Sequence, residues 1–82
     1  MATISAAIRN SSTSDYIVHV YDLFGGGTNE VSGSPFFLAA GETSSTFSVH
    51  ASSDEVGTVS YTCESGPSLS NIEVEDGETV EI

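Results

Sequence analysis

His19, His50 and Cys63 are the residues of this chain that are best suited to metal binding or nucleophilic chemistry. No short ligand spacing of the Cys-x-x-Cys or His-x-x-x-His kind accompanies them. His19 and Asp22 are three residues apart in a predicted strand, so their side chains point to opposite faces. Cys63 lies on the apolar face of its strand, which predicts a buried thiol. We therefore expect no metal site, no cofactor and no cysteine-based catalysis.

Acidic residues gather at positions 54–55 and 73–78. Calcium takes six to eight oxygen ligands, and loop carboxylates at one end of a fold can supply some of them. The chain has no Asp-x-Asp-x-Asp loop, and Glu73 and Glu75 fall on a solvent-facing side of a predicted strand. We interpret these acids as a solvated edge and keep calcium binding as an alternative. No pair of carboxylates marks a glycosidase cleft, and serine is too abundant to indicate a triad, so we predict that the protein is not an enzyme.

The charge balance excludes several classes of partner. Twelve acids face a single base, Arg9, and the net charge is −11. Nucleic-acid binding and attraction to an anionic membrane both need a basic surface, and no apolar run is long enough for a membrane helix. So high a charge destabilises a fold by self-repulsion, which high salt, divalent cations or a basic partner would offset. The start Met1-Ala2-Thr3-Ile4 lacks the features of a signal peptide, so the chain is either a mature form or a protein that is made and used without export. The location is open between these two, and we favour an extracellular or virion-surface one.

The length of 82 residues predicts one domain, residues 1–82, with a small core. A single cysteine excludes an intramolecular disulfide. Asn10-Ser11-Ser12 matches a glycosylation sequon, but a serine-rich turn produces this pattern easily by chance.

Apolar residues alternate with polar ones along most of the chain, which is typical of strands. We expect about seven strands in an all-β, single antiparallel β-sandwich, and no helix longer than one turn. The last third, residues 56–82, should form a three-stranded meander with turns at 65–68 and at Asp76-Gly77. The expected strands are at 3–9, 15–24, 30–32, 36–38, 43–50, 57–63, 70–75 and 78–82.

Tyr61-Thr62-Cys63 resembles the sixth strand of an immunoglobulin-type domain, in which a tyrosine precedes a cysteine by two residues. The partner cysteine and the tryptophan of that pattern are missing. The resemblance implies an immunoglobulin-like sandwich in which the Tyr61 hydroxyl anchors a loop and Cys63 is a buried thiol. It implies no function.

The strand at 15–24 is apolar on both faces, a pattern typical of strands that are covered on both sides. Tyr16, Val18 and Val20 form one face, and the other should be a surface that contacts a partner. One of the neighbouring residues Phe36 and Phe37 should also face outward. The alternative is that loops of the same chain cover this face. The predicted interaction surface consists of Ile17, His19, Tyr21, Leu23 and Phe36.

These features predict a non-catalytic structural or interaction module that acts in a protein assembly, by binding a protein partner or by self-association. A virion surface, an appendage or a cell surface would suit it. The alternative is a small β-sandwich that binds carbohydrate or calcium, in which Tyr16, Tyr21 or Tyr61 would stack on a sugar. Tryptophan, the usual sugar platform, is absent.

Overall fold

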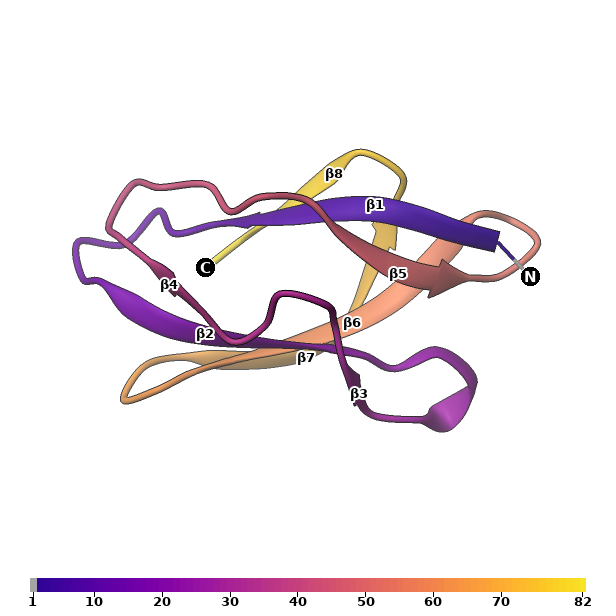
Figure 1. The fold of residues 1–82 in the computed structure, drawn as a ribbon, viewed down its shortest axis with the longest axis horizontal. Helices are drawn as coiled ribbons and strands as arrows, with labels where there is room; N and C mark the ends of the chain where they lie inside the picture. The colour runs from indigo at the N-terminus through magenta and orange to yellow at the C-terminus, as the bar shows by residue number, and fades with distance from the viewer. Residues whose placement is uncertain (1) are drawn as a thin grey trace.

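Two β-sheets make up the protein, as the computed structural model of residues 2–82 shows (Figure 1). Met1 lies outside the described residues. It begins the segment Met1-Ala2-Thr3-Ile4, for which we predict no signal peptide. The one helical element is a short 3₁₀ turn, η1 (Phe24–Gly26), so the expectation of no helix beyond one turn is confirmed for residues 2–82. The strands are β1 (Ala2–Arg9), β2 (Tyr16–Asp22), β3 (Asn29–Glu30), β4 (Phe36–Leu38), β5 (Phe47–Ala51), β6 (Val56–Cys63), β7 (Ser68–Glu75) and β8 (Glu78–Glu81).

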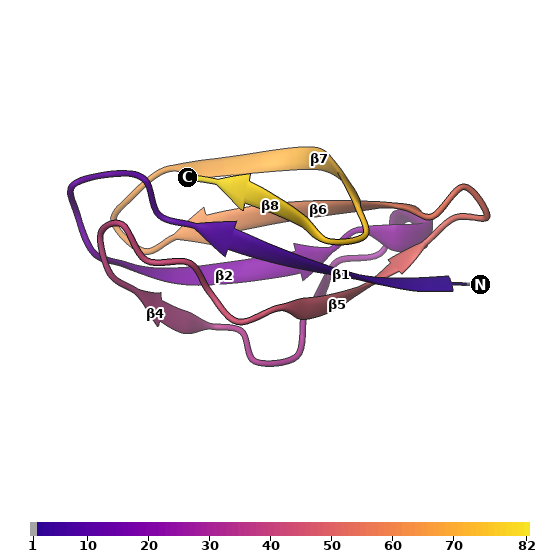
Figure 2. The same ribbon diagram turned by 90° about the horizontal axis from the view of Figure 1, so that it is seen from above.

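The strand order differs between the two sheets. The smaller sheet is β5-β1-β8, with β1 antiparallel to β5 but parallel to β8. In the larger sheet β2 is flanked by β6 on one side, while β3 and β4 pair with successive parts of its other side. β7 extends this sheet beyond β6. Seen from above, β4 and β5 lie along one side of the molecule and β7 and β8 along the other (Figure 2).

The core forms where the apolar faces of the two sheets meet. Alternation along β6 places Val59, Tyr61 and Cys63 inward, so the prediction of a buried thiol at Cys63 is confirmed. Both sheets contribute to one continuous cluster, because burial of apolar surface drives their association. Its fully buried members include Ile8, Val18, Val20, Leu38, Val49 and Val74.

Gly57 brings the two sheets into close approach at one end. A Cβ atom at this position would lie 2.8 Å from Val49 Cγ1 and 3.0 Å from the His50 carbonyl oxygen. Both atoms belong to β5, whereas Gly57 belongs to β6. The glycine is therefore required by packing across the sheets, since its φ angle is not in the left-handed region.

The predicted meander of the last third is wrong in its final strand. β6 and β7 pair antiparallel as expected, but β8 leaves them and pairs with β1 in the other sheet. The turn at Asp76-Gly77 is held there by β1: Asp76 Oδ1 accepts a hydrogen bond from the Ser5 N–H at 2.8 Å, and the Gly77 N–H donates to the Ser5 carbonyl at 2.7 Å. The expectation of an entirely antiparallel arrangement is wrong for the same reason.

Four of the predicted strands are shorter than expected, and the difference is largest for those predicted at 15–24 and 43–50. β2 ends at Asp22, because the Asp22 carboxylate accepts the N–H of Phe24 at 3.0 Å and the chain turns into η1. β5 begins only at Phe47, because Ser44 binds β1 with its own N–H and hydroxyl. The Ser44 hydroxyl accepts the Ile8 N–H, which interrupts the ladder between residues 43 and 46.

Candidate interaction surface

The outer face of β2 carries apolar side chains, as the sequence predicts. Ile17 is 42% exposed, and its neighbour in register on β4, Phe37, is 62% exposed. His19 and Tyr21 continue the same face and are half-buried; their rings stack with centroids 6.4 Å apart and planes 8° from parallel. We call Ile17, His19, Tyr21 and Phe37 the outer patch.

Two carboxylates flank His19 at opposite ends of its ring. Nδ1 lies 3.0 Å from Glu30 Oε2, and Nε2 lies 2.9 Å from Glu64 Oε2. The Ser34 hydroxyl donates to the same Glu30 oxygen at 2.8 Å and accepts the Val20 N–H. Residues from β2, β3 and the β6–β7 turn thus converge on one imidazole and fix its orientation in the outer patch.

The pKa of His19 is raised above its usual value of 6.5 by the hydrogen bonds to Glu64 and Glu30, in that order. A raised folded-state pKa means that protonation stabilises the fold. This stabilisation is complete below pH 6.5 and is lost as the pH rises through the folded-state pKa. We therefore predict that Glu64→Gln lowers the His19 midpoint measured by NMR titration, whereas Glu73→Gln on β7 leaves it unchanged. A midpoint that does not move in Glu64→Gln would contradict the hydrogen-bond assignment.

The structure separates the residues of the predicted surface. Ile17, His19 and Tyr21 share the outer patch, whereas Leu23 lies beyond the end of β2 and is half-buried. Phe36 packs against the core, and Phe37 is the member of the pair that faces outward. Chain segments around Glu30 and Glu64 cover His19 in part, but Ile17 and Phe37 stay exposed.

Asp22 forms a second polar cluster that the sequence does not reveal. It is buried at the end of β2, and its Oδ2 accepts the backbone N–H of His50 at 3.0 Å and contacts His50 Nδ1 at 2.8 Å. Burial favours the neutral carboxyl, but the hydrogen bonds from His50 and Phe24 outweigh burial and lower the pKa of Asp22 below its usual 3.8. The signal in the sequence is an acid at the end of an apolar strand, which also suits an ordinary turn.

The residues suited to metal or nucleophilic chemistry are not assembled into one site. His19 and His50 belong to separate clusters, and burial raises the pKa of the Cys63 thiol, which disfavours the reactive thiolate. Within residues 2–82, no group of three or more His, Cys, Asp or Glu side chains is arranged to hold a metal ion. The pKa of the Tyr61 hydroxyl is also raised, first by burial and then by its electrostatic interaction with Cys63.

No protein-family model, curated protein or solved structure matches the chain. In the part of the chain described here, no helix is both long and apolar enough to cross a membrane.

Proposed function

We propose that the protein is a non-catalytic structural or interaction module that binds a protein partner through the outer patch. The supporting observation is the exposed pair Ile17 and Phe37, which are direct neighbours on β2 and β4. Exposing two large apolar side chains side by side on a sheet face to water costs free energy, and contiguous exposed apolar area is typical of contact surfaces. Virion-surface, appendage and cell-surface assemblies are the settings that suit such a module.

The proposal includes a finer description of the fold, a single immunoglobulin-like β-sandwich that acts as one domain. Its support is the shared core between two sheets and the inward position of Tyr61 and Cys63 on a strand between β2 and β7. The parallel pairing of β8 with β1 places the chain's last strand in the same sheet as its first.

The non-catalytic part of the proposal is supported by the state of the titratable groups. Both ring nitrogens of His19 have carboxylate partners, and the buried Asp22 has backbone and side-chain partners that hold it in place. Polar networks that are fully satisfied in this way rigidify a fold.

Site-specific photo-crosslinking in the cells that produce the protein tests this function. A benzophenone amino acid at position 37 should give a discrete adduct with another chain, whereas the same probe at Leu69, an exposed leucine on β7, should give none. Ile17→Thr, which keeps a β-branched residue in the strand, should reduce the position-37 adduct severalfold. No adduct at position 37, with a monodisperse monomer by light scattering at high concentration, would rule the proposal out.

A further inference from the structure

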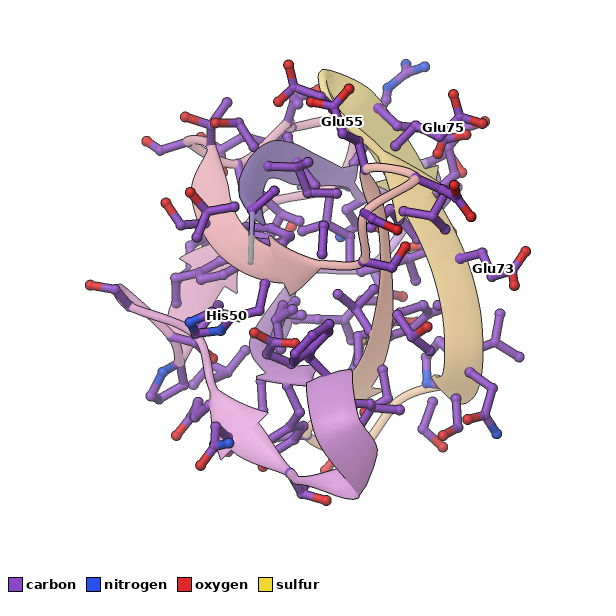
Figure 3. The ribbon with its side chains drawn as sticks, turned by 90° about the vertical axis from the view of Figure 1, so that its right-hand side faces the viewer. His50, Glu55, Glu73 and Glu75 are labelled. Atoms are coloured by element: carbon purple, nitrogen blue, oxygen red, sulfur yellow. The ribbon has the colours of Figure 1, made fainter. Side chains whose placement is uncertain are left out.

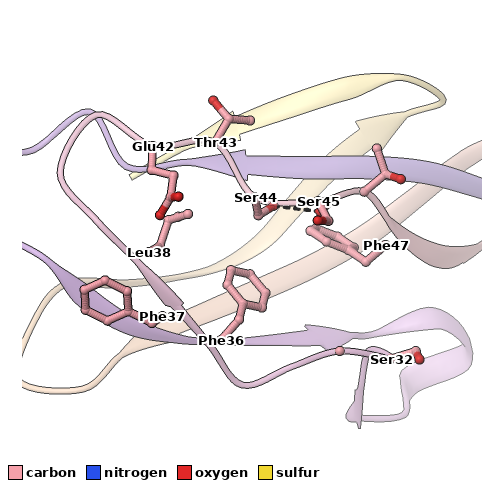
Figure 4. A pocket seen from close by; sticks show the side chains of 11 residues that line it. Ser32, Phe36, Phe37, Leu38, Glu42, Thr43, Ser44, Ser45 and Phe47 are labelled. Carbon is pink, nitrogen blue, oxygen red and sulfur yellow. Dashed lines mark hydrogen bonds between the residues drawn. The ribbon is translucent and has the colours of Figure 1, made fainter.

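A groove of about 350 Å³ lies between β4 and the segment that leads into β5 (Figure 4). The rings of Phe36 and Phe47 project into the space between the two segments, and Leu38 lies beside them (Figure 4). Hydroxyl side chains at Ser44 and Ser45 form the opposite wall. The groove therefore combines an apolar floor with polar walls, and it opens on the side of the molecule where both sheets end.

The backbone of Phe37 is free for pairing at this groove. The Ile17 carbonyl accepts the Glu64 N–H, so Ile17 directs its backbone groups toward β6. Since direction alternates along an antiparallel strand, Tyr16 and Val18 bond instead to Leu38 and Phe36 of β4. The N–H and C=O of Phe37 then point away from β2, to an edge that no other strand of residues 2–82 covers.

The next N–H along this edge already has a substitute partner. The Ala39 N–H donates to Glu42 Oε1 at 2.9 Å, as it would to the carbonyl of an added strand. Glu42 also lines the groove and places a carboxylate at its end. The unpaired part of the edge is therefore confined to Phe37. Before it, Pro35 has no N–H, and after it the Ala39 N–H is bonded to Glu42.

The opposite side of the molecule is protected against the same kind of pairing. Glu73 and Glu75 project from β7 in Figure 3, and Glu78 and Glu81 belong to the neighbouring β8. Exposed charges on edge strands discourage pairing with other chains. The three residues of β4 itself carry no charge, and Phe37 exposes its aromatic ring instead.

The negative charge of the chain favours a basic ligand in the groove. None of the described residues that line it is basic, and the guanidinium of Arg9, the single arginine, lies 3.7 Å from the Glu81 carboxylate on β8. Two copies that each carry −11 would repel one another, whereas a basic segment would be attracted.

We infer that an extended basic segment of a partner protein adds to the β4 edge, pairs with the Phe37 backbone and inserts alternate apolar side chains between Phe36 and Phe47. This inference rests on the proposed function and names the partner's chemistry. Alternation suits an extended strand, whose side chains point in turn to the groove and to solvent.

The test uses a short blocked peptide that alternates lysine and valine, added to the isotope-labelled full chain and followed by NMR. Amide shifts should concentrate at residues 36–38 and 43–47, and exchange of the Phe37 amide with water should slow. Two further peptides carry N-methyl groups on alternate residues. In one peptide the methylated nitrogens are those that would face β4, and in the other they are those that would face away from it. Methylation on the side that faces β4 should weaken binding at least about tenfold, and methylation on the other side should not.

The outcomes separate this inference from the proposed function. Equal binding by both methylated peptides, binding by a glutamate–valine peptide, or shifts spread over the whole surface would each overturn the inference. Shifts at residues 36–38 that grow with protein concentration, without peptide, would assign the edge to a second copy and overturn it as well. A position-37 crosslink in cells together with any of these results would leave the proposed function in place.

Discussion

Replacement of Asn10 by alanine should destabilise the protein by about 3 kcal/mol, a large part of the ~4–12 kcal/mol expected for a domain of this size. The Asn10 side chain is completely buried. Its Nδ2 donates to the Ser14 carbonyl at 2.7 Å and to the Leu38 carbonyl at 3.1 Å. Its Oδ1 accepts the Ser12 N–H at 3.0 Å and the Ser12 hydroxyl. Alanine would leave the buried Leu38 carbonyl without this donor and the half-buried Ser12 N–H without its acceptor, whereas the exposed Ser14 carbonyl keeps the Ser12 hydroxyl.

Urea unfolding followed by circular dichroism measures this loss, with Asn29→Ala as the control because Asn29 is exposed on β3. The control should stay within about 0.5 kcal/mol of the unmodified protein. A loss below about 1 kcal/mol in Asn10→Ala would show that the network does not depend on this amide.

Asn10→Asp distinguishes the donor role of Nδ2 from simple filling of space. A carboxylate oxygen in place of Nδ2 would face the Ser14 and Leu38 carbonyls, which only accept hydrogen bonds. The variant should be destabilised at neutral pH and should recover part of the loss at acid pH, where a protonated carboxyl can donate once. The same geometry bears on the sequon at Asn10, because a buried nitrogen with two acceptors is inaccessible to glycosylation in the folded protein.

The strands could be predicted because their signal is local. Alternation along β6 is enough to bury Val59, Tyr61 and Cys63, whatever strand lies next to them. The path of β8 could not be predicted in this way. Asp76-Gly77 suits a tight hairpin, but contacts with Ser5, far away in the sequence, take the strand to the other sheet.

The outer patch shows the same limit at the level of single residues. The outward direction of Ile17 follows from its position between Tyr16 and Val18 in a long strand. A three-residue strand such as β4 gives no comparable signal, and a shift of one residue exchanges its two faces. Only the pairing of Ile17 with Phe37 decides that Phe37 faces outward and Phe36 faces the core.

Asp22→Ala should destabilise the protein by about 2–3 kcal/mol, because one carboxylate joins the two sheets. Asp22 ends β2 in the larger sheet, and its Oδ2 accepts the N–H of His50 on β5, the edge strand of the smaller sheet. Its Oδ1 accepts the Phe24 N–H and fixes the start of η1. This contact lies near Gly57, because the His50 carbonyl oxygen would be 3.0 Å from a Cβ atom at Gly57. The carboxylate therefore binds the exposed edge of β5 at a place where the two sheets pack closely.

His50→Ala separates the backbone role of Asp22 from its contact with the imidazole. The His50 side chain is more than half exposed, and its loss leaves the bond to the backbone N–H intact. We expect a change within about 1 kcal/mol, well below that of Asp22→Ala. Comparable losses in the two variants would mean that the imidazole, and not the strand edge, is the important partner.

The pH dependence of stability tests the charge of Asp22. Its folded-state pKa is lowered, so its contribution is present above the usual value of 3.8 and disappears as the pH falls through the folded-state pKa. Asp22→Asn keeps one acceptor but cannot titrate. Thermal melting between neutral pH and about pH 2 should therefore show a shallower acid limb in Asp22→Asn than in the unmodified protein, while Glu75→Gln, an exposed carboxylate on β7, should preserve the full slope. An unchanged acid limb in Asp22→Asn would show that ionisation of Asp22 does not set the acid sensitivity of the fold.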